Sequence, residues 1–180
     1  VMENSRNTAK QETRSAIIKA ALQLFNKEGF DGPSLDAICA KAGFTRGAFY
    51  VHFTDRDDLV AAAMGDALQG LLERVIDGNP EEEASLLRTV VRYIDERLLP
   101  RAEGEETGGP PFDQFLQACH RSSKVQKIFQ ETIGEAIRRI ETSVVSGQTS
   151  DVIRGDIESG DISTVLTLMA LGALVAVDVS

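Results

Sequence analysis

The stretch that most constrains the fold of this chain is SLDAICAKAGFTRGAFYVHF at residues 34–53. Ser34 can cap a helix, because its hydroxyl can accept a hydrogen bond from a free backbone N–H two or three residues later. Gly43 suits the left-handed position at which a helix ends, and Thr45 can cap a second helix. The stretch therefore predicts two short helices that are joined by a tight glycine turn.

Apolar residues within this stretch recur at helical spacing. Ile38 and Cys39 fall on one face of the first helix, and Phe49 and Phe53 fall on the inward face of the second. Polar or small residues take most of the remaining positions of the second helix. Two helices joined in this way form a helix-turn-helix, whose second helix enters the major groove of DNA.

Further motifs accompany this pair of helices at fixed spacing. A Gly-aromatic pair lies at residues 29–30, Gly-x-Thr at 43–45, Tyr-x-His-Phe at 50–53 and an acidic-basic step at 55–56. The segment from about residue 13 to residue 64 thereby resembles the N-terminal domain of TetR-family transcriptional regulators. The resemblance implies a three-helix helix-turn-helix domain followed by a helical bundle with ligand-binding and dimerisation roles.

The resemblance and the residue types together indicate which side chains contact DNA. Arg46 opens the second helix and can either bind guanine in a bidentate manner or bind a phosphate, and Gly47 would let the helix approach the groove closely. Tyr50 and His52 match residues that reach phosphate oxygens in the family, whereas Arg56 has two interpretations, a phosphate contact or an ion pair with a neighbouring aspartate. The expected DNA-binding residues are Ser34, Thr45, Arg46, Gly47, Tyr50, His52 and Arg56.

The distribution of charge agrees with a DNA contact at the N-terminal end. The whole chain has a net charge of −9, but residues 1–60 contain eight basic and eight acidic residues and are neutral. Residues 6–56 contain eight basic and five acidic residues, a net charge of +3. Long-range electrostatics therefore favour DNA meeting this end of the chain, and the expected partner is double-stranded DNA with a pseudo-palindromic operator.

Helical spacing recurs along the chain and period-two alternation is scarce, so we predict an all-α protein. The expected parts are a flexible arm at 1–12, the helix-turn-helix domain at 13–56 and an effector-binding and dimerisation domain at 57–180. In the last part we expect helices at about 55–77, 81–98, 112–119, 124–146 and 149–159, and a final helix that Ser163 caps. The stretch PRAEGEETGGPP at residues 100–111 is expected to be a mobile loop.

The apolar segment VLTLMALGALVAV at residues 165–177 must be covered by other residues. A membrane span needs about 20 apolar residues, so this segment is too short for one. The resemblance implies that the last two long helices pair with those of a second copy, and the alternative is a core helix of a monomer. The expected homodimer interface comprises Ile133, Ile137, Ile140, Leu166, Met169, Ala173, Leu174 and Val177.

The C-terminal domain contains no motif, and the resemblance implies a small-molecule pocket within it. Candidates come from the mid-chain helices, and each is also open to interpretation as an ordinary core or surface residue. The expected effector-binding residues are Arg92, Tyr93, Glu96, Phe112, Phe115, Leu116, Cys119, His120, Phe129 and Ile133.

These patterns favour a homodimeric repressor that a small molecule releases from its operator. An alternative is a regulator of the same fold that has no effector and is controlled by a protein partner. A helical enzyme is disfavoured, because no nucleophile–base–acid set and no glycine-rich phosphate loop occur, and the chain holds only two histidines. Cys39 and Cys119 lack metal-ligand spacing, and the N-terminus does not resemble a signal peptide, so we expect a cytoplasmic protein without cofactor or metal.

Overall fold

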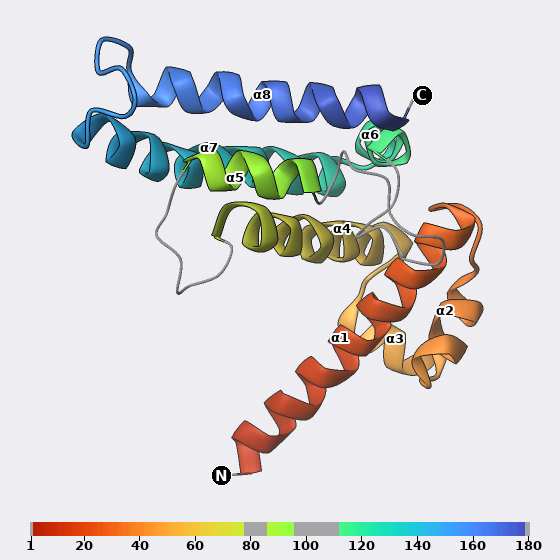
Figure 1. The fold of residues 1–180 in the computed structure, drawn as a ribbon. Coiled ribbons are helices and arrows are strands. Elements are labelled where there is room, and N and C mark those ends of the chain that lie inside the picture. The colour runs from red at the N-terminus through yellow and green to blue at the C-terminus, as the bar shows by residue number, and fades with distance from the viewer. Residues whose placement is uncertain (1, 78–85, 96–111, 179–180) are drawn as a thin grey trace. The chain divides into compact units, whose positions relative to one another are not determined.

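The computed structural model describes residues 2–77, 86–95 and 112–178. Every regular element within these ranges is helical, which confirms the all-α fold class. The elements (Figure 1) are α1 (Met2–Glu28), α2 (Leu35–Ala42), α3 (Arg46–His52), α4 (Arg56–Leu72), a π-helical turn η1 (Glu73–Asp77), α5 (Leu86–Tyr93), α6 (Phe112–Arg121), α7 (Ser123–Thr149) and α8 (Ser159–Asp178). The chain divides into two compact units, one formed by residues 1–67 and 106–128 and the other by residues 68–105 and 129–180.

The core of the first unit forms where α1 packs against α2 and α3 (Figure 1). Phe25 of α1, Ile38 of α2 and Phe49 of α3 are fully buried. Phe49 also packs on Phe53, with ring centroids 5.2 Å apart. Fully burying an apolar side chain contributes roughly 1.5–3 kcal/mol, so this cluster holds the three helices together.

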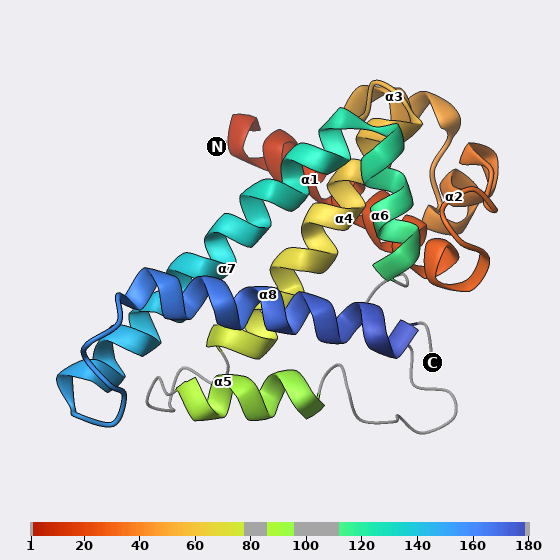
Figure 2. The same cartoon turned by 90° about the horizontal axis from the view of Figure 1, so that it is seen from above.

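The helix α6 belongs to the first unit and lies beside the first turns of α4 (Figure 2). Its Phe112 and Phe115 are buried, and their ring centroids are 6.0 Å apart. Arg121, the last residue of α6, forms an ion pair with Asp31 in the α1–α2 connection. The unit that contains the helix-turn-helix is therefore larger than the expected domain at residues 13–56.

The expectation of a flexible arm at residues 1–12 is wrong, because α1 is a 27-residue helix that begins at Met2. Residues 2–28 contain no glycine or proline that would interrupt the helix. Thr13 donates its hydroxyl to the carbonyl of Ala9 at 3.0 Å, one turn earlier. The first turns are polar, so they lack the apolar periodicity that would have predicted a helix.

The core of the second unit forms around the second half of α7. Ala136, Ile140 and Val144 are buried there. This half of α7 lies beside the start of α8 (Figures 1 and 2), where the Ser159 hydroxyl donates to the Glu141 carboxylate at 2.7 Å. No helix in the described ranges is long and apolar enough to cross a membrane.

Two expectations about the end of α7 and the start of α8 are wrong. Residues 150–158 form turns in place of the predicted helix at 149–159, because the N–H groups of Val152 and Ile153 turn back to the carbonyl of Gly147. Ser163 does not cap the last helix, which begins at Ser159. Ser163 is fully buried in the second turn, where its hydroxyl donates to the Ser159 carbonyl at 2.7 Å.

The connection between α4 and α5 also differs from the sequence prediction. The α-helix expected to run to residue 77 ends at Leu72, and η1 follows it. The Arg92 guanidinium donates to the backbone carbonyls of Val75 and Ile76 at 2.8 and 2.9 Å, so these two carbonyls of η1 have hydrogen-bond partners. Of the helix expected at 81–98, α5 covers residues 86–93, and the expected loop at 100–111 lies outside the described residues.

Candidate nucleic-acid interface

The turn between α2 and α3 is built as the sequence predicts. The Ser34 hydroxyl accepts from the N–H of Ala37 at 3.1 Å, and the Thr45 hydroxyl accepts from the N–H of Ala48 at 3.3 Å. Gly43 ends α2 with a φ of 78°, a left-handed conformation that glycine adopts without steric cost. These caps fix where each helix begins and ends, and both hydroxyls keep a proton that they could donate to a phosphate.

The outward face of α3 is exposed while its inward face is anchored. Phe49 is fully buried, and its neighbour Tyr50 is 53% exposed with its ring edge-on to Phe49. Arg46 is exposed, and its guanidinium lies 3.5 Å from the Asp36 carboxylate of α2. Hydrogen bonding to Tyr50, followed by the charge of Asp36, raises the pKa of Arg46 above its usual value. The arginine and the tyrosine therefore lie together on the face that is open to a partner.

Gly47 lies on the same exposed face. A Cβ atom added at this position would meet only the Thr45 hydroxyl within 4 Å, at 3.6 Å. Its backbone is helical, so neither sterics nor backbone conformation requires glycine here. Glycine inside a helix costs about 1 kcal/mol relative to alanine. The fold of the chain thus gives no reason for this residue, whereas a close approach to DNA does.

His52, at the end of α3, is half-buried, in contrast to Tyr50. Its Nδ1 atom is buried and has no hydrogen-bond partner among the described residues. Burial, together with the charges of Lys10 and Arg14, lowers the pKa of His52 below its usual value. The imidazole is therefore held in its neutral form beside two cations of α1.

Arg56 does not form the ion pair with a neighbouring aspartate that was one of its two expected roles. Its guanidinium donates to the carbonyl of Pro33 at 2.7 Å and to that of Phe30. It also lies over the ring of Phe25, 5.8 Å from the centroid. Asp58, one of its expected ion-pair partners, instead accepts from the N–H of Thr54 at 2.9 Å. Arg56 thus clamps the α1–α2 connection, and its phosphate contact stays a prediction.

Sequence reasoning missed the role of Asp55. Its carboxylate caps α4 by accepting from the N–H of Asp58 at 2.7 Å, and it pairs with Lys124 of α7 at 3.2 Å. The hydrogen bond from Asp58 and the pairing with Lys124 lower the pKa of Asp55. The Asp-x-x-Asp spacing resembles a capping box and could have revealed the cap, but no local signal indicates a partner 69 residues away.

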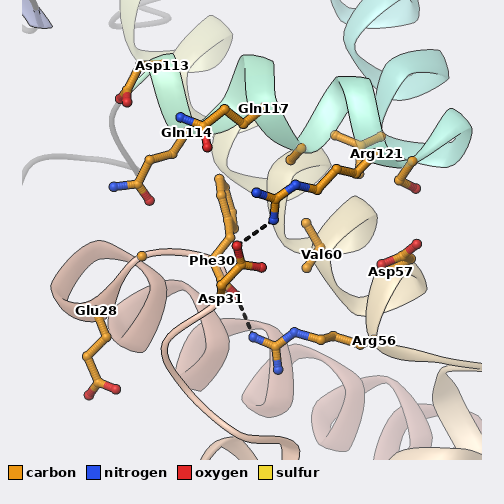
Figure 3. Close-up of a pocket in the computed structure, with 14 residues that line it drawn as sticks. Glu28, Phe30, Asp31, Arg56, Asp57, Val60, Asp113, Gln114, Gln117 and Arg121 are labelled. Carbon is orange, nitrogen blue, oxygen red and sulfur yellow. Dashed lines mark hydrogen bonds and ion pairs between the residues drawn. The ribbon is translucent and has the colours of Figure 1, made fainter.

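A pocket of about 400 Å³ lies between the α1–α2 connection, the start of α4 and α6 (Figure 3). Its buried lining includes the apolar residues Phe30, Val60 and Val125 and the polar residue Ser122. Its two arginines are already engaged, Arg121 with Asp31 and Arg56 with the Phe30 carbonyl, as the dashed lines in Figure 3 show. None of the predicted effector-binding residues lines this pocket.

The predicted effector-binding residues are distributed over both units. Arg92 and Tyr93 form hydrogen bonds within the second unit. The Arg92 guanidinium donates to two carbonyls of η1, and the Tyr93 hydroxyl donates to the Ala170 carbonyl. In the first unit, burial raises the pKa of the Cys119 thiol, and His120 is exposed. Phe112 and Phe115 are buried, Leu116, Phe129 and Ile133 are half-buried, and Glu96 lies outside the described residues. The effector site remains a prediction.

The residues predicted to form the dimer interface differ in their exposure to solvent. Met169 is 66% exposed, as an interface open to a partner requires, whereas Ile140 is buried in the core of its own unit. Ile133, Ile137, Leu166 and Ala173 are half-buried, and the side chains of Leu174 and Val177 lie outside the described set. Among the described side chains of α8, the large apolar residues that are exposed are Val165, Leu168, Met169 and Val175, of which Met169 belongs to the predicted interface.

Comparisons with known proteins agree with this architecture. Residues 17–63 match the family described as "Bacterial regulatory proteins, tetR family". The chain is 44% identical over 130 residues to the HTH-type transcriptional regulator TtgW of Pseudomonas putida, which covers 65% of this chain and 95% of that protein. It is 37% identical over 87 residues to the regulator AcrR of Shigella flexneri, covering 47% of this chain but only 40% of AcrR. A solved TetR-family regulator from Cytophaga hutchinsonii shares the fold with a TM-score of 0.75 at 21% identity, over 93% of this chain and 84% of that one.

Proposed function

Because the chain belongs to the TetR family of DNA-binding transcriptional regulators, we propose that it is a homodimeric repressor released from its operator by a small molecule. The operator would be a pseudo-palindromic duplex, since each protomer of a two-fold symmetric dimer reads one half-site. In this proposal α3 enters the major groove and the second unit carries both the dimer interface and the effector site.

The observation that carries the DNA-binding part is the outward face of α3. Arg46 and Tyr50 are exposed side by side on a helix that the buried Phe49 anchors. Gly47 lies between them and is not required by the fold. An arginine can bind guanine through two hydrogen bonds, and a tyrosine hydroxyl can donate to a phosphate. This combination suits a helix that lies deep in a groove.

The exposed stripe on α8 supports the homodimer. Val165, Leu168 and Met169 fall at i, i+3 and i+4 on one side of the helix and are more than half exposed. Contiguous exposed apolar surface is typical of an interaction site. In a dimer that buries this stripe, two copies of α3 would have to lie one helical turn of DNA apart, roughly 34–36 Å.

A relative supports the repressor and effector parts. The nicotine-responsive transcriptional repressor HdnoR of Paenarthrobacter nicotinovorans is 33% identical over 76 residues, covering 41% of this chain and 39% of that protein. A small molecule can release DNA only if it binds more tightly to a conformation in which the two recognition helices are wrongly spaced.

Selection from a pool of random duplexes tests the proposed function. We expect enrichment of a two-fold symmetric site, and sedimentation of the same protein should give the mass of a dimer at micromolar concentration. The proposal fails if no duplex is enriched over competitor DNA at low salt. Enrichment of a single half-site by a monomeric protein would contradict the dimer while leaving the DNA-binding role intact.

A further inference from the structure

The helical N-terminus brings two cations of α1 together. Lys10 and Arg14 are four residues apart within α1, so they lie on one face of the helix. The Arg14 guanidinium lies over the Phe53 ring, with its Cζ atom 5.3 Å from the ring centroid. The centroids of the His52 and Phe53 rings are 6.4 Å apart. The face that carries both cations therefore reaches the last turn of α3, next to the exposed side of the recognition helix.

These cations are available to a ligand. Within the described part of the chain, neither Lys10 nor Arg14 forms an ion pair, whereas other cations of the same unit do, such as Arg121 with Asp31 and Lys124 with Asp55. Lys10 is exposed and Arg14 is half-buried. A guanidinium carries five N–H donors, so Arg14 can still donate to a ligand while it lies over the Phe53 ring. Two like charges held together without a counter-charge are suited to an anion.

We propose that Lys10 and Arg14 of α1 bind a phosphate of the DNA backbone, and that His52 of α3 takes up a proton when that phosphate is bound. This inference rests on the proposed DNA-binding function and adds a contact that α1 supplies. It also makes operator affinity depend on pH, because the imidazole would bind a proton more readily in the complex than in the free protein.

The direction of this pH dependence follows from the surroundings of His52. Burial and the charges of Lys10 and Arg14, both on α1, lower the pKa of His52 in the free protein. A bound phosphate would neutralise the two like charges and add a negative charge nearby, so the pKa would rise again. The complex would then bind more protons than the free protein. DNA affinity is therefore expected to increase as the pH falls through the titration range of the histidine.

Salt dependence tests the phosphate contact. Lys10→Gln should lower the magnitude of the slope of log affinity against log salt by about 0.9 per protomer. Lys19→Gln is the matched control, because Lys19 is an exposed lysine of the same helix. It lies nine residues from Lys10, or two and a half turns at 3.6 residues per turn, and so faces the opposite side. Equal slopes for the two variants would overturn the phosphate contact.

The two histidines of the chain provide the second test. Wild-type affinity for the selected duplex is measured from pH 8 downward, together with that of His52→Gln and of His120→Gln. His120 is exposed on α6, and its replacement should leave the increase in affinity at lower pH unchanged. His52→Gln should abolish the increase.

The outcomes separate this inference from the function on which it rests. If the wild-type protein binds no duplex, the proposed function fails and the phosphate site falls with it. If the wild type binds but the pH dependence survives in His52→Gln, only the proposal that His52 takes up a proton is overturned. Because Lys10 is exposed, Lys10→Gln should fold normally, so the salt test remains decisive even if the histidine variant unfolds.

Discussion

Replacement of Arg56 distinguishes a structural clamp from a DNA contact. The guanidinium donates to two carbonyls of the α1–α2 connection and lies over the ring of Phe25. Hydrogen bonds to charged groups contribute about 1.5–3 kcal/mol each, so the loss of both in Arg56→Met should cost about 3 kcal/mol at the lower limit. For a chain of this size, 1 kcal/mol shifts Tm by roughly 2–4 °C. We therefore expect Arg56→Met to lower Tm by at least about 6–12 °C.

Thermal unfolding followed by circular dichroism measures this effect, and Arg56→Lys refines it. Lysine keeps the charge but lacks the planar fork that reaches two carbonyls, so this variant should also be less stable. Arg138→Lys is the control, because Arg138 is exposed and its one ion-pair partner among the described residues is Glu135, one turn earlier. The clamp is refuted if Arg56→Met unfolds at the wild-type temperature, and a lower salt slope of DNA binding in that variant would restore the phosphate contact.

Three further predictions concern α3 and α8. Gly47→Ala should stabilise the protein by up to about 1 kcal/mol in urea unfolding, because the added methyl group fits the fold. The same variant should bind DNA more weakly in a titration, because the methyl group would contact the groove. Arg46→Ala should relax preference at one base pair of each half-site by about 1–3 kcal/mol in competition binding, whereas Tyr50→Phe should weaken binding to all sequences alike. Met169→Lys should yield a monomer in sedimentation, whereas Val152→Lys, which replaces an apolar residue that is 81% exposed outside the helices, should not.

The helix-turn-helix was predictable because its signals are local. Ser34, Gly43 and Thr45 act within a few residues of their own position, and all three adopt the predicted roles. The observed helices α2 and α3 begin immediately after the two capping residues. Short-range hydrogen bonds of this kind can be inferred from residue type and spacing alone.

The errors occurred where the local signal was absent or where it was ambiguous. The first turns of α1 are polar and carry no apolar stripe, so they resembled a tail. Ser163 was interpreted as a cap, but a serine hydroxyl can also bond to the carbonyl four residues earlier inside a helix, as it does here. The clamp formed by Arg56 spans 23 and 26 residues of sequence, a separation at which spacing gives no indication of contact.

The structure shows that basic residues which look alike in the sequence have different interaction partners. Arg56 donates to two carbonyls and Lys124 pairs with a carboxylate, all within their own unit, so their N–H groups are already engaged. Arg46 contacts Tyr50 and an exposed carboxylate at 3.5 Å, and an exposed ion pair of this kind is worth less than about 1 kcal/mol. Lys10 and Arg14 have no ion-pair partner among the described residues. Because counterion release scales with the number of phosphates that are neutralised, the salt dependence of DNA binding should arise mainly from Lys10, Arg14 and Arg46, and replacing Lys124 should leave the slope unchanged.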